Sequence, residues 1–146
     1  MRNWFLALGL LPALLGVVAR ADDAILVFDA SGSMWGQVEG KTKAEIARSV
    51  VSDLLNQIPP DRRLGLVAYG HRRAGDCNDI EELVPVGTDR EAIRKQVNAL
   101  AFKGKTPLTS AVRFAAEKLR YREGKATVIL VSDGAESCNA DPCALG

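Results

Sequence analysis

Apolar and polar positions follow two different periods along the chain. Four short runs are apolar with few polar interruptions, which is typical of strands buried on both faces of a sheet. They are AILVFD (24–29), LGLVAYG (64–70), IEELVPV (80–86) and ATVILVSDG (126–134). The third run is the least apolar, and its Pro85 lacks the N–H that an interior strand donates. We therefore expect four strands, with the third at an edge of the sheet.

Three segments between the predicted strands have apolar residues at helical spacing. A Thr42-x-x-Glu45 capping box opens the first helix, which Pro59-Pro60 ends, and Thr88-x-x-Glu91 repeats the capping box before the second. Pro107 suits the first turn of a third helix. The expected buried faces of the three helices are, in order, Ile46, Val50, Val51, Leu54, Leu55 and Ile58; Ile93, Val97 and Leu100; and Leu108, Ala111, Val112, Ala115 and Leu119.

Strands separated by helices predict an α/β fold, a doubly wound and mostly parallel sheet with helices on both faces. The mature chain, residues 22–146, has the length of one domain. Its last strand, TVILV, is as apolar as a strand with neighbours on both sides, and at an edge it would promote aggregation. We therefore expect residues 22–146 to be the N-terminal part of the domain, with at least one helix and strand beyond Gly146.

The first 21 residues have the pattern of a signal peptide. Arg2 precedes an apolar segment at 5–18, and Ala19-Arg20-Ala21 offers small residues for cleavage before Asp22. The segment is shorter than the ~20 residues of a membrane span, although an uncleaved anchor remains the alternative. We expect an exported protein, periplasmic or secreted.

The charge of the mature chain is close to neutral. Cleavage removes two of the 19 basic residues, Arg2 and Arg20, and none of the 18 acidic ones, which leaves a net charge of −1. Such a balance indicates no nucleic-acid partner and no membrane contact beyond the signal segment.

Three cysteines follow the signal segment, Cys77, Cys138 and Cys143. In an exported chain they favour one disulfide and one free thiol. The short loop NADP between Cys138 and Cys143 favours that pair, with Cys77 as the competing partner for either. Zinc is the rival use, but His71 is the only histidine and the spacings match no zinc pattern.

Carboxylates and hydroxyls gather where two strands end. The first strand ends at Asp29, followed by Ser31 and Ser33, and the fourth ends at Asp133. Ligands of an open parallel sheet bind at the carboxyl ends of its strands. If these strands are neighbours, the two carboxylates repel each other unless a cation lies between them. Oxygen ligands of this kind suit Mg²⁺ or Mn²⁺.

The stretch Asp29-Ala30-Ser31-Gly32-Ser33 resembles the first element of the metal-ion-dependent adhesion site of von Willebrand factor type A (vWA) domains. Thr106 in GKTPL resembles the second element, and Asp133 in VSDG the third. The resemblance covers residues 23–146. It implies a sheet of order 3-2-1-4-5-6 and a metal held through the hydroxyls of Ser31, Ser33 and Thr106. It further implies that Asp29 and Asp133 act mostly through bound water, and that an acidic side chain of a partner protein completes the coordination.

Several other interpretations of these residues stay open. Thr109, one helical turn after Thr106, competes with it as the threonine ligand. Asp29, Ser31 and Ser33 could form only a helix cap and turn, or a structural subunit could carry the site without metal.

A metal-dependent hydrolase or phosphatase is the enzyme alternative, but Ser31 stands where aspartyl phosphatases carry a second Asp. The GKT at 104–106 lacks the glycine of a P-loop, since Ala99 stands in its place. The sequence therefore predicts a divalent-metal-dependent protein-binding module and not an enzyme.

Overall fold

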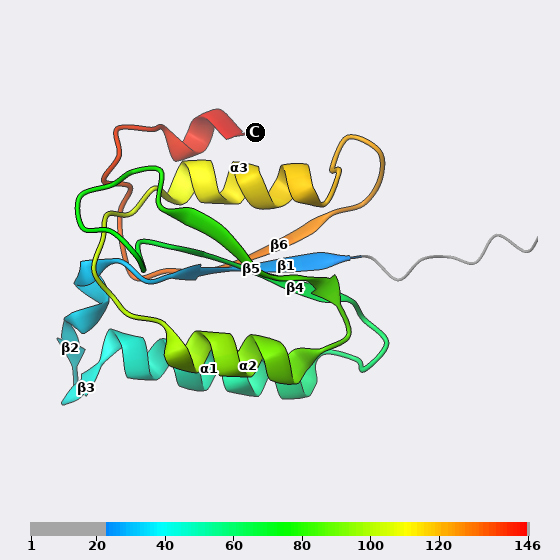
Figure 1. The fold of residues 1–146 in the computed structure, drawn as a ribbon, viewed down its shortest axis with the longest axis horizontal. Coiled ribbons are helices and arrows are strands. Elements are labelled where there is room, and N and C mark those ends of the chain that lie inside the picture. Colours follow the sequence, from blue (N-terminus) through cyan, green and yellow to red (C-terminus); the bar gives the residue numbers. More distant parts are fainter. Residues whose placement is uncertain (1–22, 146) are drawn as a thin grey trace, which may run out of the picture.

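A computed structural model describes residues 23–145 and shows three layers (Figure 1). A four-stranded sheet of order β5-β4-β1-β6 lies in the middle. Helix α3 covers one face, and α1 and α2 cover the other. The strands are β1 (Ala24–Asp29), β4 (Leu64–Tyr69), β5 (Ile80–Gly87) and β6 (Thr127–Val131). The helices are α1 (Lys43–Gln57), α2 (Arg90–Ala99) and α3 (Leu108–Lys118). The predicted fold class is confirmed.

Strand β1 is the centre of the sheet. It pairs in parallel with β4 on one side and with β6 on the other, and all six of its residues are buried. This burial explains why the run Ala24–Phe28 has no polar alternation, because both faces and both edges of the strand are covered. The carboxyl ends of β1, β4 and β6 therefore lie at the same end of the sheet.

Strand β5 departs from the expected parallel pairing. It lies at the edge, as Pro85 indicated, but runs antiparallel to β4. The reason is the connection: residues 70–79 form a loop without a helix, and a parallel neighbour needs a crossover that returns the chain to the starting end of the sheet. The residues between the second and third predicted strands contain no helical pattern. The sequence therefore already indicated that these two strands pair in antiparallel.

The helices begin close to their predicted starts. Thr42 and Glu45 form the expected capping box of α1, each accepting a hydrogen bond from the other's backbone N–H. In α2 the cap lies one residue later than predicted, since Asp89 accepts from the N–H of Ala92. Pro107 is the N-cap of α3. Four short elements were not predicted: η1 (Gly32–Trp35), β2 (Gln37–Val38), β3 (Lys41–Thr42) and η2 (Pro142–Leu145).

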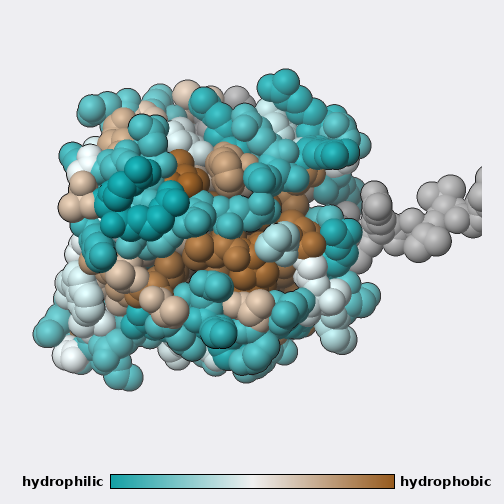
Figure 2. All heavy atoms as spheres, in the orientation of Figure 1, coloured by the Kyte–Doolittle hydropathy of each residue, from teal (hydrophilic) through white to brown (hydrophobic). Residues whose placement is uncertain are grey.

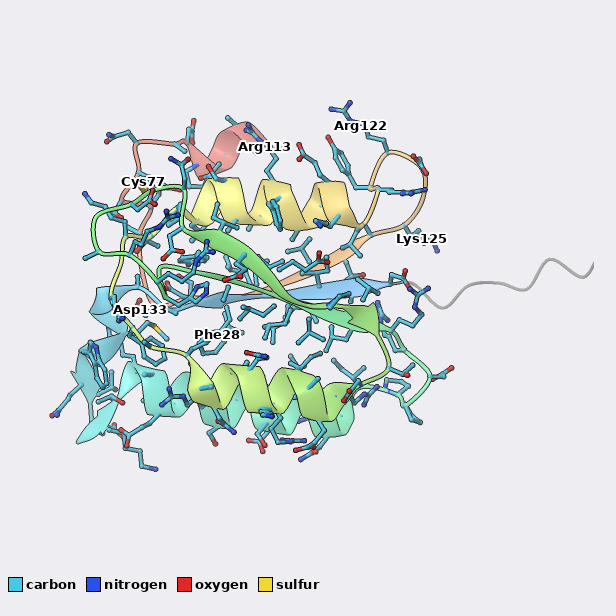
Figure 3. The ribbon with its side chains drawn as sticks, viewed as in Figure 1. Phe28, Cys77, Arg113, Arg122, Lys125 and Asp133 are labelled. Atoms are coloured by element: carbon cyan, nitrogen blue, oxygen red, sulfur yellow. A yellow bond between two sulfur atoms is a disulfide. The ribbon has the colours of Figure 1, made fainter. Side chains whose placement is uncertain are left out.

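Two apolar clusters fill the layers. The larger lies between the sheet and α1 and α2 and contains Phe28, Leu66 and Val51; Figure 3 shows Phe28 on this side of the sheet. The smaller lies under α3 and contains Tyr69 and Ala115. Figure 2 shows apolar atoms gathered at the level of the sheet, with polar atoms over the helices. Burial of this apolar surface is the main favourable contribution to folding.

The apolar face of α1 is only partly buried. Ala44, Ala47, Val51 and Leu55 pack into the core, whereas Ile46 and Val50, which the periodicity also placed on the buried face, are exposed. Ile46 and Val50 line a groove together with Val38 and Val131. In the described residues, β6 has no neighbour on its outer edge, so nothing there covers this side of α1.

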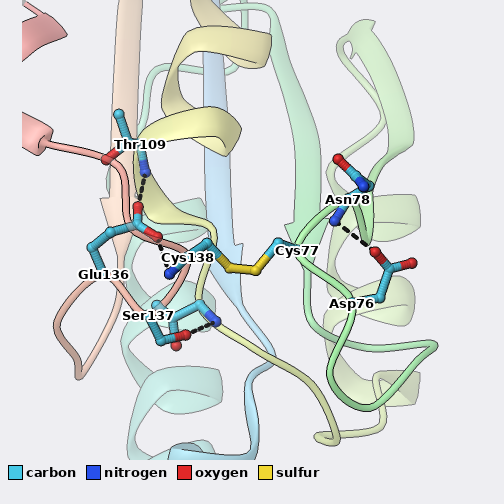
Figure 4. The surroundings of a disulfide bond; sticks show 8 residues. Asp76, Cys77, Asn78, Thr109, Glu136, Ser137 and Cys138 are labelled. Atoms are coloured by element: carbon cyan, nitrogen blue, oxygen red, sulfur yellow. Dashed lines mark hydrogen bonds between the residues drawn. A yellow bond between two sulfur atoms is a disulfide. The ribbon is translucent and has the colours of Figure 1, made fainter.

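The predicted disulfide is wrong. Cys77 is bonded to Cys138, and Cys143 is a free, exposed thiol (Figure 4). The bond joins the β4–β5 loop to the loop that follows β6. Both loops lie at the carboxyl end of the parallel strands, which brings two cysteines 61 residues apart in sequence to neighbouring positions. Cys143 lies instead in η2, where its N–H donates to Asp141.

The predicted signal segment, residues 1–21, lies outside the described residues. Within residues 23–145, no helix combines the length and the apolar character that crossing a membrane requires.

Candidate functional site

Three loops meet at the carboxyl end of the sheet, and two glycines allow it. The backbone N–H of Gly32 donates to Gly104 O over 3.0 Å, and the N–H of Gly104 donates to Gly70 O over 2.8 Å. Gly70 has φ +72°, and a Cβ there would lie 2.7 Å from Lys105 O. A Cβ on Gly104 would lie 2.8 Å from Arg73 O. The loops after β1 and β4 and before α3 therefore make contact through their backbones.

Asp29, at the end of β1, is completely buried. One carboxylate oxygen accepts from the N–H of Ser31 over 2.8 Å, and the other accepts from Ser132 Oγ over 2.6 Å. Ser132 in turn accepts from the hydroxyl of Tyr69 over 3.2 Å. Burial, together with the nearby charge of Asp29, raises the pKa of Tyr69 well above its usual value, so the phenol stays protonated.

The two serine hydroxyls connect the first loop to Asp133. Ser31 Oγ and Ser33 Oγ lie 3.0 Å apart, and Ser33 Oγ donates to Asp133 Oδ1 over 2.9 Å. The structure thus brings four of the five predicted ligands together from two loops about a hundred residues apart in sequence. Figure 3 shows Asp133 at this end of the molecule.

Thr106 lies on the neighbouring loop, which contacts Ser31 through the bridge between Ser31 and Gly104. Its side chain is buried, its N–H donates to Ser137 Oγ over 2.8 Å, and its carbonyl accepts from the N–H of Ser137. Among the described residues, no hydrogen bond joins Thr106 to Asp29, Ser31, Ser33 or Asp133. The threonine thus borders the cluster from a loop that Ser137 holds in place.

Thr109, the competing threonine, has its N–H in the first turn of α3. This N–H donates to Glu136 Oε2 over 2.8 Å, and Glu136 Oε1 accepts from the N–H of Cys138 (Figure 4). Glu136 therefore caps α3 with a negative charge where the helix dipole favours one. The hydroxyl of Thr109 is buried without a hydrogen-bond partner among the described residues. Glu136 was not predicted, because a capping residue outside the helix's own sequence leaves no local pattern.

Lys43 was not predicted either, and it contacts the cluster directly. Its ammonium donates to Asp133 Oδ2 over 2.6 Å, while Oδ1 of the same carboxylate accepts from Ser33. Lys43 is the first residue of α1. Its partner Asp133 lies 90 residues away in sequence, so no local pattern marks this lysine.

The oxygen spacing fits a small divalent cation. Adjacent ligands of an octahedral Mg²⁺ with 2.0–2.1 Å bonds lie about 2.9 Å apart, and the hydroxyl oxygens of Ser31 and Ser33 are 3.0 Å apart. No group of three or more His, Cys, Asp or Glu side chains forms a metal cluster in residues 23–145. A site here would depend on hydroxyls and two carboxylates, which is the donor set of a hard cation.

The β4–β5 loop beside the site is held by a buried carboxylate. Asp79 accepts from the N–H and Nε of Arg72 over 2.7 and 2.6 Å and from the N–H of Arg73 over 3.0 Å. His71 Nε2 lies 2.9 Å from Glu81 Oε2. The basic triplet His71–Arg73 is therefore used largely within its own loop, although Arg73 remains the most exposed of the three.

We expect the stability that Asp79 supplies to depend on pH. Burial raises its pKa, but hydrogen bonds from the N–H of Arg73 and from the side chain and N–H of Arg72 outweigh that effect and lower it. A lowered folded-state pKa stabilises the protein above the unfolded value, about 3.9, and this contribution is lost as the pH falls through the folded value. In urea titrations, Asp79→Asn should be less stable than wild type at pH 7, and the difference should shrink below about pH 4. Asp61→Asn, at an exposed turn, is the control; a pH-independent difference for Asp79→Asn would contradict the assignment.

A sequence profile of the von Willebrand factor type A domain matches residues 24–136. The uncharacterized proteins YwmD and YwmC of Bacillus subtilis strain 168 are 29% and 25% identical to this chain over 86% and 85% of its length. The match covers 61% of YwmD and 59% of YwmC, so the chain spans about three fifths of the length of these curated relatives.

Solved structures with the same fold include two bacterial pilus proteins. The pilus adhesin SpaC from Lactobacillus rhamnosus GG has a TM-score of 0.66 at 22% identity, over 82% of this chain and 16% of SpaC. The vWF domain of the type V pili tip protein Mfa5 from Porphyromonas gingivalis has a TM-score of 0.56 at 24% identity, over 77% of this chain and 38% of the other. At such identities the likeness shows the fold. The match of the family profile to most of the chain shows that this protein belongs to the von Willebrand factor type A domain family.

Proposed function

We propose that this vWA domain is a divalent-metal-dependent protein-binding module of an exported protein. The hydroxyls of Ser31, Ser33 and Thr106 would hold Mg²⁺ or Mn²⁺, with Asp29 and Asp133 acting mostly through bound water. The observation that carries the proposal is the hydrogen-bonded series at the sheet end, in which Asp29 accepts from the N–H of Ser31 and the hydroxyls of Ser31 and Ser33 lead to Asp133. The metal, when bound, supplies an open coordination position for a carboxylate.

The charge of the site favours an acidic partner. Asp29, Asp133 and Lys43 together carry one negative charge, and a divalent cation would reverse that sign to one positive charge. An acidic side chain from a partner protein would then neutralise the site while completing the coordination. This is how a binding site with only two carboxylates of its own can select a carboxylate ligand.

Trp35 offers an anchor beside the site. Its side chain is 59% exposed, yet its Nε1 donates to Phe102 O over 3.0 Å and its ring packs edge-on against Phe102. A large aromatic residue held in one orientation at the surface is the kind of residue that dominates protein interfaces. Trp35 follows Ser33 by two residues, and in this proposal a partner at the metal would also contact this ring.

Binding rather than catalysis fits the surroundings of the two serines. Their hydroxyls bond to each other and to Asp133, while His71, the only histidine of the chain, is paired with Glu81. The pilus adhesin and pilus tip protein among the structural neighbours are in keeping with an exported binding role, as is the signal pattern in residues 1–21.

The test is a melting series with metal. Mg²⁺ that binds only the folded protein stabilises it by about 2.7 kcal/mol at a hundredfold excess over Kd. We expect this gain in wild type and in Ser49→Ala, an exposed control on α1, and its loss in Ser33→Ala. Arrays of Asp- or Glu-containing peptides should bind in Mg²⁺ but not in EDTA, and more strongly than their Asn and Gln counterparts. The proposal is wrong if neither Mg²⁺ nor Mn²⁺ shifts the wild-type melting temperature.

A further inference from the structure

The ion pair between Lys43 and Asp133 lies inside the proposed metal centre. The ammonium is 2.6 Å from Asp133 Oδ2, and the Asp133 side chain is only 10% exposed. Asp133 therefore has a full positive charge against one of its oxygens and the hydroxyl of Ser33 against the other. Lys43 occupies the charge-compensating role that the sequence alone assigned to a metal.

Helix formation does not account for a lysine at this position. The N-terminus of a helix carries partial positive charge, so a cation in its first turn is unfavourable. The capping box of Thr42 and Glu45 already completes the start of α1. The Lys43 side chain also has a defined path: a Cβ added to Gly36 would lie 3.3 Å from Lys43 Cε and 3.6 Å from Nζ, and the Lys43 N–H donates to Gly36 O.

We propose that Lys43 is a tethered counter-cation of the metal centre, which neutralises Asp133 when metal is absent and opposes metal when it arrives. The inference rests on the proposed function. It predicts two opposite effects of removing the charge: the metal-free protein loses a compensated ion pair, and the incoming divalent cation meets a more negative site. Lys43 would therefore stabilise the metal-free protein and lower the affinity for the divalent ion.

The experiment compares Lys43→Met with wild type, using Mg²⁺ alone as the probe. In EDTA the variant should melt about 3 °C lower, and by calorimetric titration it should bind Mg²⁺ roughly tenfold more tightly. Lys43→Arg, which keeps the charge, should stay near wild type in both measurements. Lys41→Met, which removes an exposed cation from the adjacent strand β3, is the matched control and should change neither.

The outcomes separate the two proposals. Equal Mg²⁺ affinity in wild type and Lys43→Met overturns the inference and leaves the metal centre standing. The same holds if Lys41→Met tightens Mg²⁺ binding as much as Lys43→Met, because the effect would then be one of general surface charge. Absence of Mg²⁺ binding from every protein in the set overturns the proposed function itself, and the inference with it.

Discussion

Replacing Cys77 and Cys138 by alanine together should lower the free energy of unfolding by about 4 kcal/mol. The bond closes a loop of 61 residues. In the chain-entropy model, a crosslink of that span lowers the conformational entropy of the unfolded chain, which stabilises the folded state by about 4 kcal/mol. It also ties the β4–β5 loop, which Asp79 organises, to the loop carrying Asp133 and Glu136. Loss of the bond should therefore loosen the site as well as the fold.

Urea denaturation of the oxidised proteins checks this effect, with Cys143→Ala as the control. Cys143 is exposed and free, so its replacement should leave the midpoint within experimental error. Peptide mapping under non-reducing conditions should recover Cys77 linked to Cys138. A double variant as stable as Cys143→Ala, or a map that links Cys138 to Cys143, would contradict this assignment.

The disulfide shows where sequence spacing fails as a guide. Cys138 and Cys143 are close along the chain and flank a proline, which favoured pairing them. Three-dimensional placement decides instead, because parallel strands deliver the loops after β4 and β6 to one end of the sheet. The stretch between Cys138 and Cys143 leads instead into η2, where Asp141 accepts a hydrogen bond from the N–H of Cys143.

Sequence reasoning found the residues of the cluster that lie just after strand ends, and it missed those whose partners are distant in sequence. The positions of Asp29 and Asp133 followed from two apolar runs that stop at a carboxylate, and the order of the strands brought them together. Lys43 was missed because its contact with Asp133 spans 90 residues and leaves no pattern beside it. Ser132 was missed for the same reason: only the fold shows that its hydroxyl donates to Asp29.

The helical periodicity predicted where the helices are more accurately than it predicted which of their residues are buried. Ile93, Val97 and Leu100 are all buried as expected, because β5 and β4 lie against that side of α2. Ile46 and Val50 have the same spacing on α1, but no described element covers them. Periodicity reports which residues share a helix face, and only the neighbouring elements decide whether that face is buried.

Gly70→Ala should be the most damaging single substitution at the site, lowering the free energy of unfolding by about 3 kcal/mol. Two costs combine there. A left-handed backbone conformation, φ +72°, costs an alanine about 1–2 kcal/mol. The new methyl group would also lie 2.7 Å from Lys105 O and 3.1 Å from Ser31 N, and a backbone overlap of this kind costs about 1–3 kcal/mol.

Gly75→Ala separates these two costs. Gly75 has nearly the same conformation, φ +77°, but nothing lies within 4 Å of a Cβ added there, so it should lose only about 1 kcal/mol. Relief of the overlap at Gly70 requires the loop bearing Ser31 and the loop bearing Thr106 to move away from Gly70. Gly70→Ala should therefore lose the Mg²⁺-induced rise in melting temperature even where it is folded, while Gly75→Ala keeps it. Melting curves of both variants with and without Mg²⁺ make the comparison, and equal losses of stability with equal Mg²⁺ responses would mean that the loops do not need this close backbone approach.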